Sequence, residues 1–76
     1  MNKARRKALQ GIMDKIQELR DELEPLCDEE EKFKENIPEN MQESERYEKA
    51  SDAVDALGEA IEHLENATES IEGAIE

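Results

Sequence analysis

The chain has 76 residues, of which 42% are charged, and a net charge of −12. A chain this short holds one small domain with little core of its own, and its single cysteine, Cys27, excludes an intrachain disulfide. The acidic balance argues against direct binding to nucleic acid phosphates or to anionic lipid. We therefore expect the fold to be completed either by a metal or by self-association.

The charge is uneven along the chain. Residues 1–20 carry six Lys/Arg against two Asp/Glu, so this part is basic and the remainder is strongly acidic. No run approaches the roughly 18 apolar residues of a membrane span, and no apolar signal region follows the basic start. We expect a cytoplasmic protein with no membrane partner.

The first half of the chain has apolar residues at alternating spacings of three and four, which is the period of a packed helix. The positions are Leu9, Ile12, Ile16, Leu19, Leu23, Leu26, Glu30 and Phe33. Pro25 lies inside this pattern and removes one backbone hydrogen bond, which favours a kink. Because the pattern keeps its phase past Pro25, we predict one kinked helix over about 3–34 rather than two helices.

A turn is predicted at about 35–40, where Pro38 disfavours helical geometry at Ile37. Asn36 with Glu39 and Asn40 with Glu43 both have the spacing of an N-cap and its reciprocal acid. The start of the second helix is therefore fixed only to within one turn, and we place it at about residue 41.

The second helix, predicted over about 41–76, repeats the same spacing more regularly. Its apolar positions are Tyr47, Ala50, Val54, Leu57, Ile61, Leu64, Thr68, Ile71 and Ile75. Ala53, Ala60, Ala67 and Ala74 each precede one of them and widen the apolar face, as in a bundle of more than two helices. The alternative is that alanine simply favours helix at half-exposed positions.

Helices of these lengths would each span roughly 50 Å and lie antiparallel. The predicted fold is all-α, an antiparallel two-helix hairpin that dimerises into a four-helix bundle or coiled-coil-like assembly. Phe33, Ile37, Met41 and Tyr47 would close the turn end, and the basic residues 3–7 would lie beside the acidic C-terminal end. The predicted oligomer interface comprises Ile12, Ile16, Leu19, Leu23, Leu26, Ala53, Val54, Leu57, Ala60, Ile61, Leu64, Ala67 and Ile71.

One acidic residue, Glu30, falls on the apolar stripe, where a buried carboxylate needs a partner. The hairpin would bring Arg46 and the hydroxyl of Tyr47 close to it, and we hypothesise a turn-end polar cluster of these three residues that fixes the register of the helices. The alternative is that Pro25 shifts the phase and leaves Glu30 exposed.

No group of residues has the pattern of an active site. The acidic run 28–31 cannot converge on one metal ion, because consecutive helical residues point in different directions. His63 is expected to face water, and Cys27 has no histidine or cationic cluster to activate it. We expect a protein that is not an enzyme and holds no metal or cofactor.

Three stretches carry a resemblance: residues 28–31 (Asp-Glu-Glu-Glu), residues 36–40 (Asn-Ile-Pro-Glu-Asn) and residues 44–48 (Ser-Glu-Arg-Tyr-Glu). Over nearly the whole chain the sequence resembles an uncharacterised family of short acidic helical-hairpin proteins of bacteria and their mobile elements. That family has no assigned activity, so the resemblance implies a helical hairpin and no site residue.

The doubled apolar pattern and the alanine row favour a self-associating interaction module, most simply a homodimer, with an acidic surface open to a basic protein partner. The alternative is an acidic mimic of nucleic acid that inhibits a DNA-handling protein, since rows of carboxylates on a rigid rod can imitate spaced phosphates.

Overall fold

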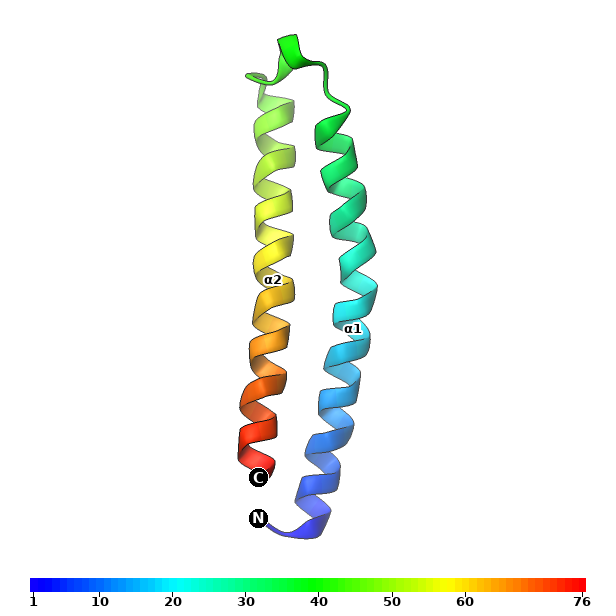
Figure 1. Ribbon diagram of the computed structural model, residues 1–76, viewed down its shortest axis with the longest axis vertical. Helices are drawn as coiled ribbons and strands as arrows, with labels where there is room; N and C mark the ends of the chain where they lie inside the picture. The colour runs from blue at the N-terminus through cyan, green and yellow to red at the C-terminus, as the bar shows by residue number, and fades with distance from the viewer.

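The protein is an all-helical hairpin in the computed structural model, which describes residues 1–76. Helix α1 (Lys3–Glu35) and helix α2 (Glu45–Ile75) run antiparallel and are joined by a segment that contains a short 3-10 helix, η1 (Glu39–Met41). The rod measures 59 × 16 × 13 Å, and the two termini lie at the end opposite the turn (Figure 1). The predicted antiparallel hairpin is confirmed.

Helix α1 begins at a cap and continues without a break through Pro25. The side chain of Asn2 accepts a hydrogen bond of 2.7 Å from the backbone N–H of Arg5. Pro25 is exposed, so water can hydrate the carbonyl of Asp21, which has lost its intrahelical donor. One helix rather than two is therefore confirmed, and the kink at Pro25 stays a prediction.

Helix α2 begins four residues later than predicted, at Glu45. Its N-cap is Ser44, whose hydroxyl accepts a hydrogen bond of 3.3 Å from the backbone N–H of Tyr47. Neither predicted cap serves, because Asn36 ends α1 in a helical conformation and Asn40 lies within η1. Between them Ile37, which is only 6% exposed, packs into the turn end.

The contact between the helices follows the predicted stripe on α2 but only half of the predicted stripe on α1. The residues of α2 predicted to face its partner are all buried or half-buried. On α1 and the residues just after it, the inward positions are Leu9, Met13, Ile16, Arg20, Leu23, Cys27, Glu30, Lys34 and Ile37. Ile12, Leu19, Leu26 and Phe33 were predicted at this contact and instead lie outside it, each at least 41% exposed.

This difference has a geometric cause. The apolar side chains of α1 cover more of the helix surface than one neighbouring helix can shield, so the contact must centre on one edge of that surface. It centres on the edge that contains Met13 and Cys27. Only Met13, Ile37 and Ala50 are buried, so the hairpin alone has almost no core.

Candidate interaction surface

A continuous row of large apolar side chains lies outside the hairpin contact. We call Ile12, Leu19, Leu26 and Phe33 the outer stripe; they recur every seven residues and are 46%, 56%, 55% and 41% exposed. Successive residues seven apart lie almost above one another on a helix, so the stripe runs along one side of α1. It contains four of the six large apolar residues that the hairpin leaves exposed.

The alanine row, Ala53, Ala60, Ala67 and Ala74, runs beside the outer stripe on the same face of the hairpin. Arg46 lies seven residues before Ala53 and so extends this row toward the turn. The guanidinium carbon of Arg46 lies 4.9 Å from the centroid of the Phe33 ring, at the end of the outer stripe. The two rows therefore border each other, and we call the face that they share the open face.

Helix α2 carries no carboxylate along its side of the open face. Lys49, Ala56, His63 and Ser70 alternate with the alanines at spacings of three and four, so that all eight positions form one strip. Every Asp and Glu of α2 lies outside this strip. In a chain with a net charge of −12, a strip free of acid along a whole helix is a marked segregation of charge.

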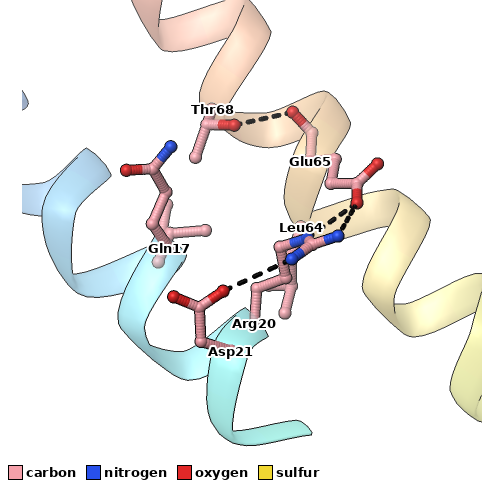
Figure 2. A pocket seen from close by; sticks show the side chains of 7 residues that line it. Gln17, Arg20, Asp21, Leu64, Glu65 and Thr68 are labelled. Atoms are coloured by element: carbon pink, nitrogen blue, oxygen red, sulfur yellow. Dashed lines mark hydrogen bonds and ion pairs between the residues drawn. The ribbon is translucent and has the colours of Figure 1, made fainter. Parts of the chain in front are cut away.

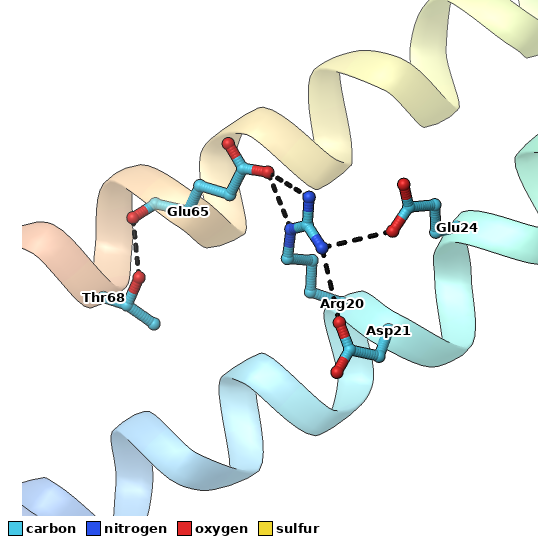
Figure 3. Close-up of polar contacts among 5 residues, drawn as sticks. All are labelled: Arg20, Asp21, Glu24, Glu65 and Thr68. Atoms are coloured by element: carbon cyan, nitrogen blue, oxygen red, sulfur yellow. Dashed lines mark hydrogen bonds and ion pairs between the residues drawn. The ribbon is translucent and has the colours of Figure 1, made fainter.

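The opposite face of the hairpin is polar and is centred on Arg20. The Nε of Arg20 donates a hydrogen bond of 2.7 Å to Oε1 of Glu65 on α2. Its Nη1 lies 3.2 Å from Glu24 and 3.3 Å from Asp21, both on α1 (Figure 3). The hydrogen bond with Glu65, opposed by partial desolvation, raises the pKa of Arg20, so the guanidinium keeps its charge at any ordinary pH.

A shallow hollow of about 280 Å³ adjoins this ion-pair cluster. Gln17 of α1 and Thr68 of α2 line it beside Arg20 and Glu65, and the hydroxyl of Thr68 donates a hydrogen bond of 2.7 Å to the carbonyl of Glu65 (Figure 2). The guanidinium is already shared among three carboxylates. The hollow therefore presents no free cation to an anionic ligand.

The predicted turn-end polar cluster is arranged differently from the hypothesis. Glu30 is half-buried, as expected for a position on the contact, yet no hydrogen bond or ion pair joins it to Arg46 or Tyr47. Instead Arg46 lies over Phe33, and the Nζ of Lys34 lies 5.6 Å from the ring centroid of Tyr47. The turn end is thus held by two contacts between cations and aromatic rings.

Cys27 is half-buried against α2, and its Sγ lies 3.9 Å from the carbonyl oxygen of Val54. Desolvation, followed by the nearby charges of Asp28, Glu31 and Glu24, raises the pKa of the thiol above its ordinary value. At neutral pH the sulfur is therefore held as a thiol, which is a poor nucleophile.

His63 is exposed, and nowhere in the chain do three or more His, Cys, Asp or Glu side chains gather in a way that could hold a metal ion. Neither helix has an apolar stretch of the length required to cross a membrane.

The residues predicted for an oligomer interface fall into two sets. Ile16, Leu23, Val54, Leu57, Ile61, Leu64 and Ile71 lie in the contact between α1 and α2 of one chain, and Ile12, Leu19, Leu26, Ala53, Ala60 and Ala67 lie on the open face. Sequence reasoning missed the pairing of Arg20 with Glu65. Its signal was present, because Arg20 is four residues after Ile16 and three before Leu23, a spacing that places it on the contact.

No family model, no curated protein sequence and no solved structure matches the chain.

Proposed function

We propose that this chain is a non-enzymatic, self-associating helical module, in which two hairpins join through their open faces to form a four-helix bundle. The observation that carries the proposal is the outer stripe. Four large apolar side chains in a regular row, each about half exposed, leave a face that water solvates poorly.

The exposed area of the single hairpin supports this proposal. A compact folded monomer of 8.7 kDa exposes about 4,700 Å², whereas this chain exposes 5879 Å². The excess, roughly 1,200 Å², exceeds the area of about 800 Å² that each partner buries in a standard interface. A second hairpin on the open face would bring the exposed area per chain close to that of a compact protein.

The distribution of charge supports a second copy as the occupant of the open face. Two chains of net charge −12 repel each other unless their carboxylates point away from the interface. The strip on α2 that faces this way has no acid, and a basic partner would gain little from docking there. A basic protein would instead meet the carboxylates on the outward sides of α2.

Those outward carboxylates also support the second candidate, an acidic mimic of nucleic acid. Asp52, Asp55, Glu59 and Glu62 lie on consecutive turns of one straight helix, as negative charges do along a nucleic acid strand. This role does not compete with dimerisation, because it uses a different face. Retention of a DNA-binding protein on immobilised dimer at low salt, lost at high salt, would support it; no retention at low salt would remove it.

The self-association is tested by sedimentation velocity across micromolar concentrations. The wild-type chain should sediment as a dimer. The double variant Leu19→Glu/Leu26→Glu should sediment as a monomer, because it places two carboxylates on the outer stripe of each copy. The matched control, Gln10→Glu/Gln17→Glu, adds the same charge to exposed positions on the other side of α1 and should stay dimeric. A folded wild-type monomer at these concentrations would refute the proposal.

A further inference from the structure

We infer that the second copy docks with its turn at the same end as the first, so that the outer stripe of each chain packs on the alanine row of the other. This inference rests on the proposed dimer and specifies its arrangement. Two copies of a rod that pair through the same face with two-fold symmetry can be arranged in two ways. In the same-end dimer the axis runs along the rods, and in the opposite-end dimer it runs across them.

The two arrangements bring different rows together. In the same-end dimer, α1 of one copy lies against α2 of the other, so the isoleucine and the two leucines of the outer stripe face alanines, and Phe33 faces Arg46. In the opposite-end dimer, α1 lies against α1 and α2 against α2, so large side chains face large ones and alanines face alanines. Large residues opposite small ones fill space evenly at a helix contact, which favours the same-end dimer.

The charges that border the open face favour the same arrangement. Lys15, Glu22 and Glu29 lie beside the outer stripe on its outer edge, spaced seven residues apart. The strip on α2 has Lys49 and His63 on its outer edge. These two edges meet across the same-end interface. Which residues face each other then depends on the height of each residue, that is, its position along the long axis of the rod.

Contacts within one hairpin fix those heights. Cys27 lies level with Val54 and Phe33 with Arg46, so Glu29 lies near the height of Lys49. Arg20 lies level with Glu65, so Glu22 lies near the height of His63. Rotation about the rod axis leaves heights unchanged. In the same-end dimer Glu29 therefore faces Lys49 of the second copy, and Glu22 faces His63 of the second copy.

The opposite-end dimer has a poorer pattern. With the outer stripes centred on each other, Lys15 would face Glu29 of the second copy, but Glu22 would face its own equivalent across the two-fold axis. His63 would likewise face its own equivalent. Like groups on an axis repel or gain nothing, whereas every acid on the edge of the same-end interface meets a basic or neutral group.

The arrangement is tested by a spin-label distance between the two turns. A nitroxide is attached at Asn40→Cys, which is exposed in η1, in a Cys27→Ala background. The same-end dimer predicts a distance of roughly 30 Å or less, set by helix spacings of about 8 to 10 Å. The opposite-end dimer predicts a distance close to the rod length of 59 Å. A label at Glu76→Cys should likewise be near its equivalent in the same-end dimer.

The outcomes separate this inference from the proposed function. A short distance at both sites supports the same-end dimer. A long distance at both sites overturns the inference and leaves the dimer standing. Absence of any dipolar coupling, together with a monomer in sedimentation of the unlabelled wild-type chain, overturns both.

A pair of charge swaps gives an independent measurement without labels. E29K/K49E and K15E/E29K both keep the net charge at −12. In the same-end dimer, E29K/K49E exchanges the two charges of a facing pair, so its dissociation constant should stay within about threefold of wild type. K15E/E29K places a lysine opposite Lys49 of the second copy, so it should weaken the dimer by roughly tenfold. The reverse order of the two affinities would overturn the inference. Circular dichroism of each variant verifies that the helices are retained.

Discussion

Arg20 of α1 and Glu65 of α2 form the one ion pair that joins the two helices, with the Nε of Arg20 donating to Glu65 at 2.7 Å. Arg20 occupies a position on the contact where Ile16 and Leu23 lie one turn to either side. Its alkyl chain packs between the helices while its guanidinium reaches the polar face. A single ion pair among aliphatic residues can fix the register of the two helices.

Replacing Arg20 with alanine should lower the thermal midpoint, because the substitution removes both the alkyl packing and the hydrogen bond to Glu65. Circular dichroism melting measures the change. Lys7→Ala is the control, since Lys7 is an exposed residue of α1 that forms no ion pair and lies on the same side of the helix as Gln10, away from the open face. Equal midpoints for the two variants would show that Arg20 acts only as a surface residue.

The hairpin, its antiparallel order and the contact stripe of α2 could be predicted because the large apolar side chains of α2 follow only one row with spacings of three and four. The contact stripe of α1 could not. Ile12 and Met13 are neighbours, and both have helical spacing to Ile16, so periodicity leaves two rows in competition. In the structure the row that contains Arg20 and Cys27 faces α2, and both residues contact that helix.

The predicted start of α2 is four residues too early for a different reason. Asn36, Asn40 and Ser44 recur every four residues, and each is a good N-cap residue. Local sequence cannot rank them, because the choice depends on how the chain must turn to bring Ile37 into the end of the contact. The open face itself was anticipated from the breadth of the apolar surface, but its division between the two helices required the structure.

Ser44→Ala should destabilise the protein by about 1 kcal/mol, the usual value of an N-cap hydroxyl. The physical reason is the loss of the acceptor for the backbone N–H of Tyr47. Urea unfolding followed by circular dichroism measures the change. Asn40→Ala is the matched control and should have little effect, since no side-chain hydrogen bond caps η1. A larger loss for Asn40→Ala would place the start of α2 at the earlier turn.

Pro25→Ala should stabilise the protein by about 1 to 3 kcal/mol. Alanine restores an N–H donor to the carbonyl of Asp21 and relieves the steric clash of proline inside a helix. Pro25 is exposed, so the substitution removes no packing within the hairpin. Urea unfolding at fixed protein concentration measures the gain. A loss of stability would show that the proline shapes α1 for a contact that the single hairpin does not contain.

Cys27 should react slowly with iodoacetamide at neutral pH. Its raised pKa keeps the thiolate fraction below that of an unstructured cysteine, and the rate should climb only as the pH rises above the ordinary thiol pKa. Because the folded state disfavours the thiolate, deprotonation at high pH should also lower stability. The unfolded chain in urea is the reference. A folded protein that reacts faster than this reference at neutral pH would contradict the assignment.

Met13→Ala and Leu19→Ala should separate folding from association, although both remove a large apolar side chain from α1. Met13 is 8% exposed within the hairpin, so its loss should cost about 2 kcal/mol or more and lower the thermal midpoint at every protein concentration. Leu19 is 56% exposed, so its loss should weaken the dimer and leave the dilute hairpin nearly unchanged. The wild-type midpoint should rise with concentration, as it does when folding and association are coupled. That dependence should persist in Met13→Ala and flatten in Leu19→Ala; an equal slope for wild type and Leu19→Ala would remove the outer stripe from the interface.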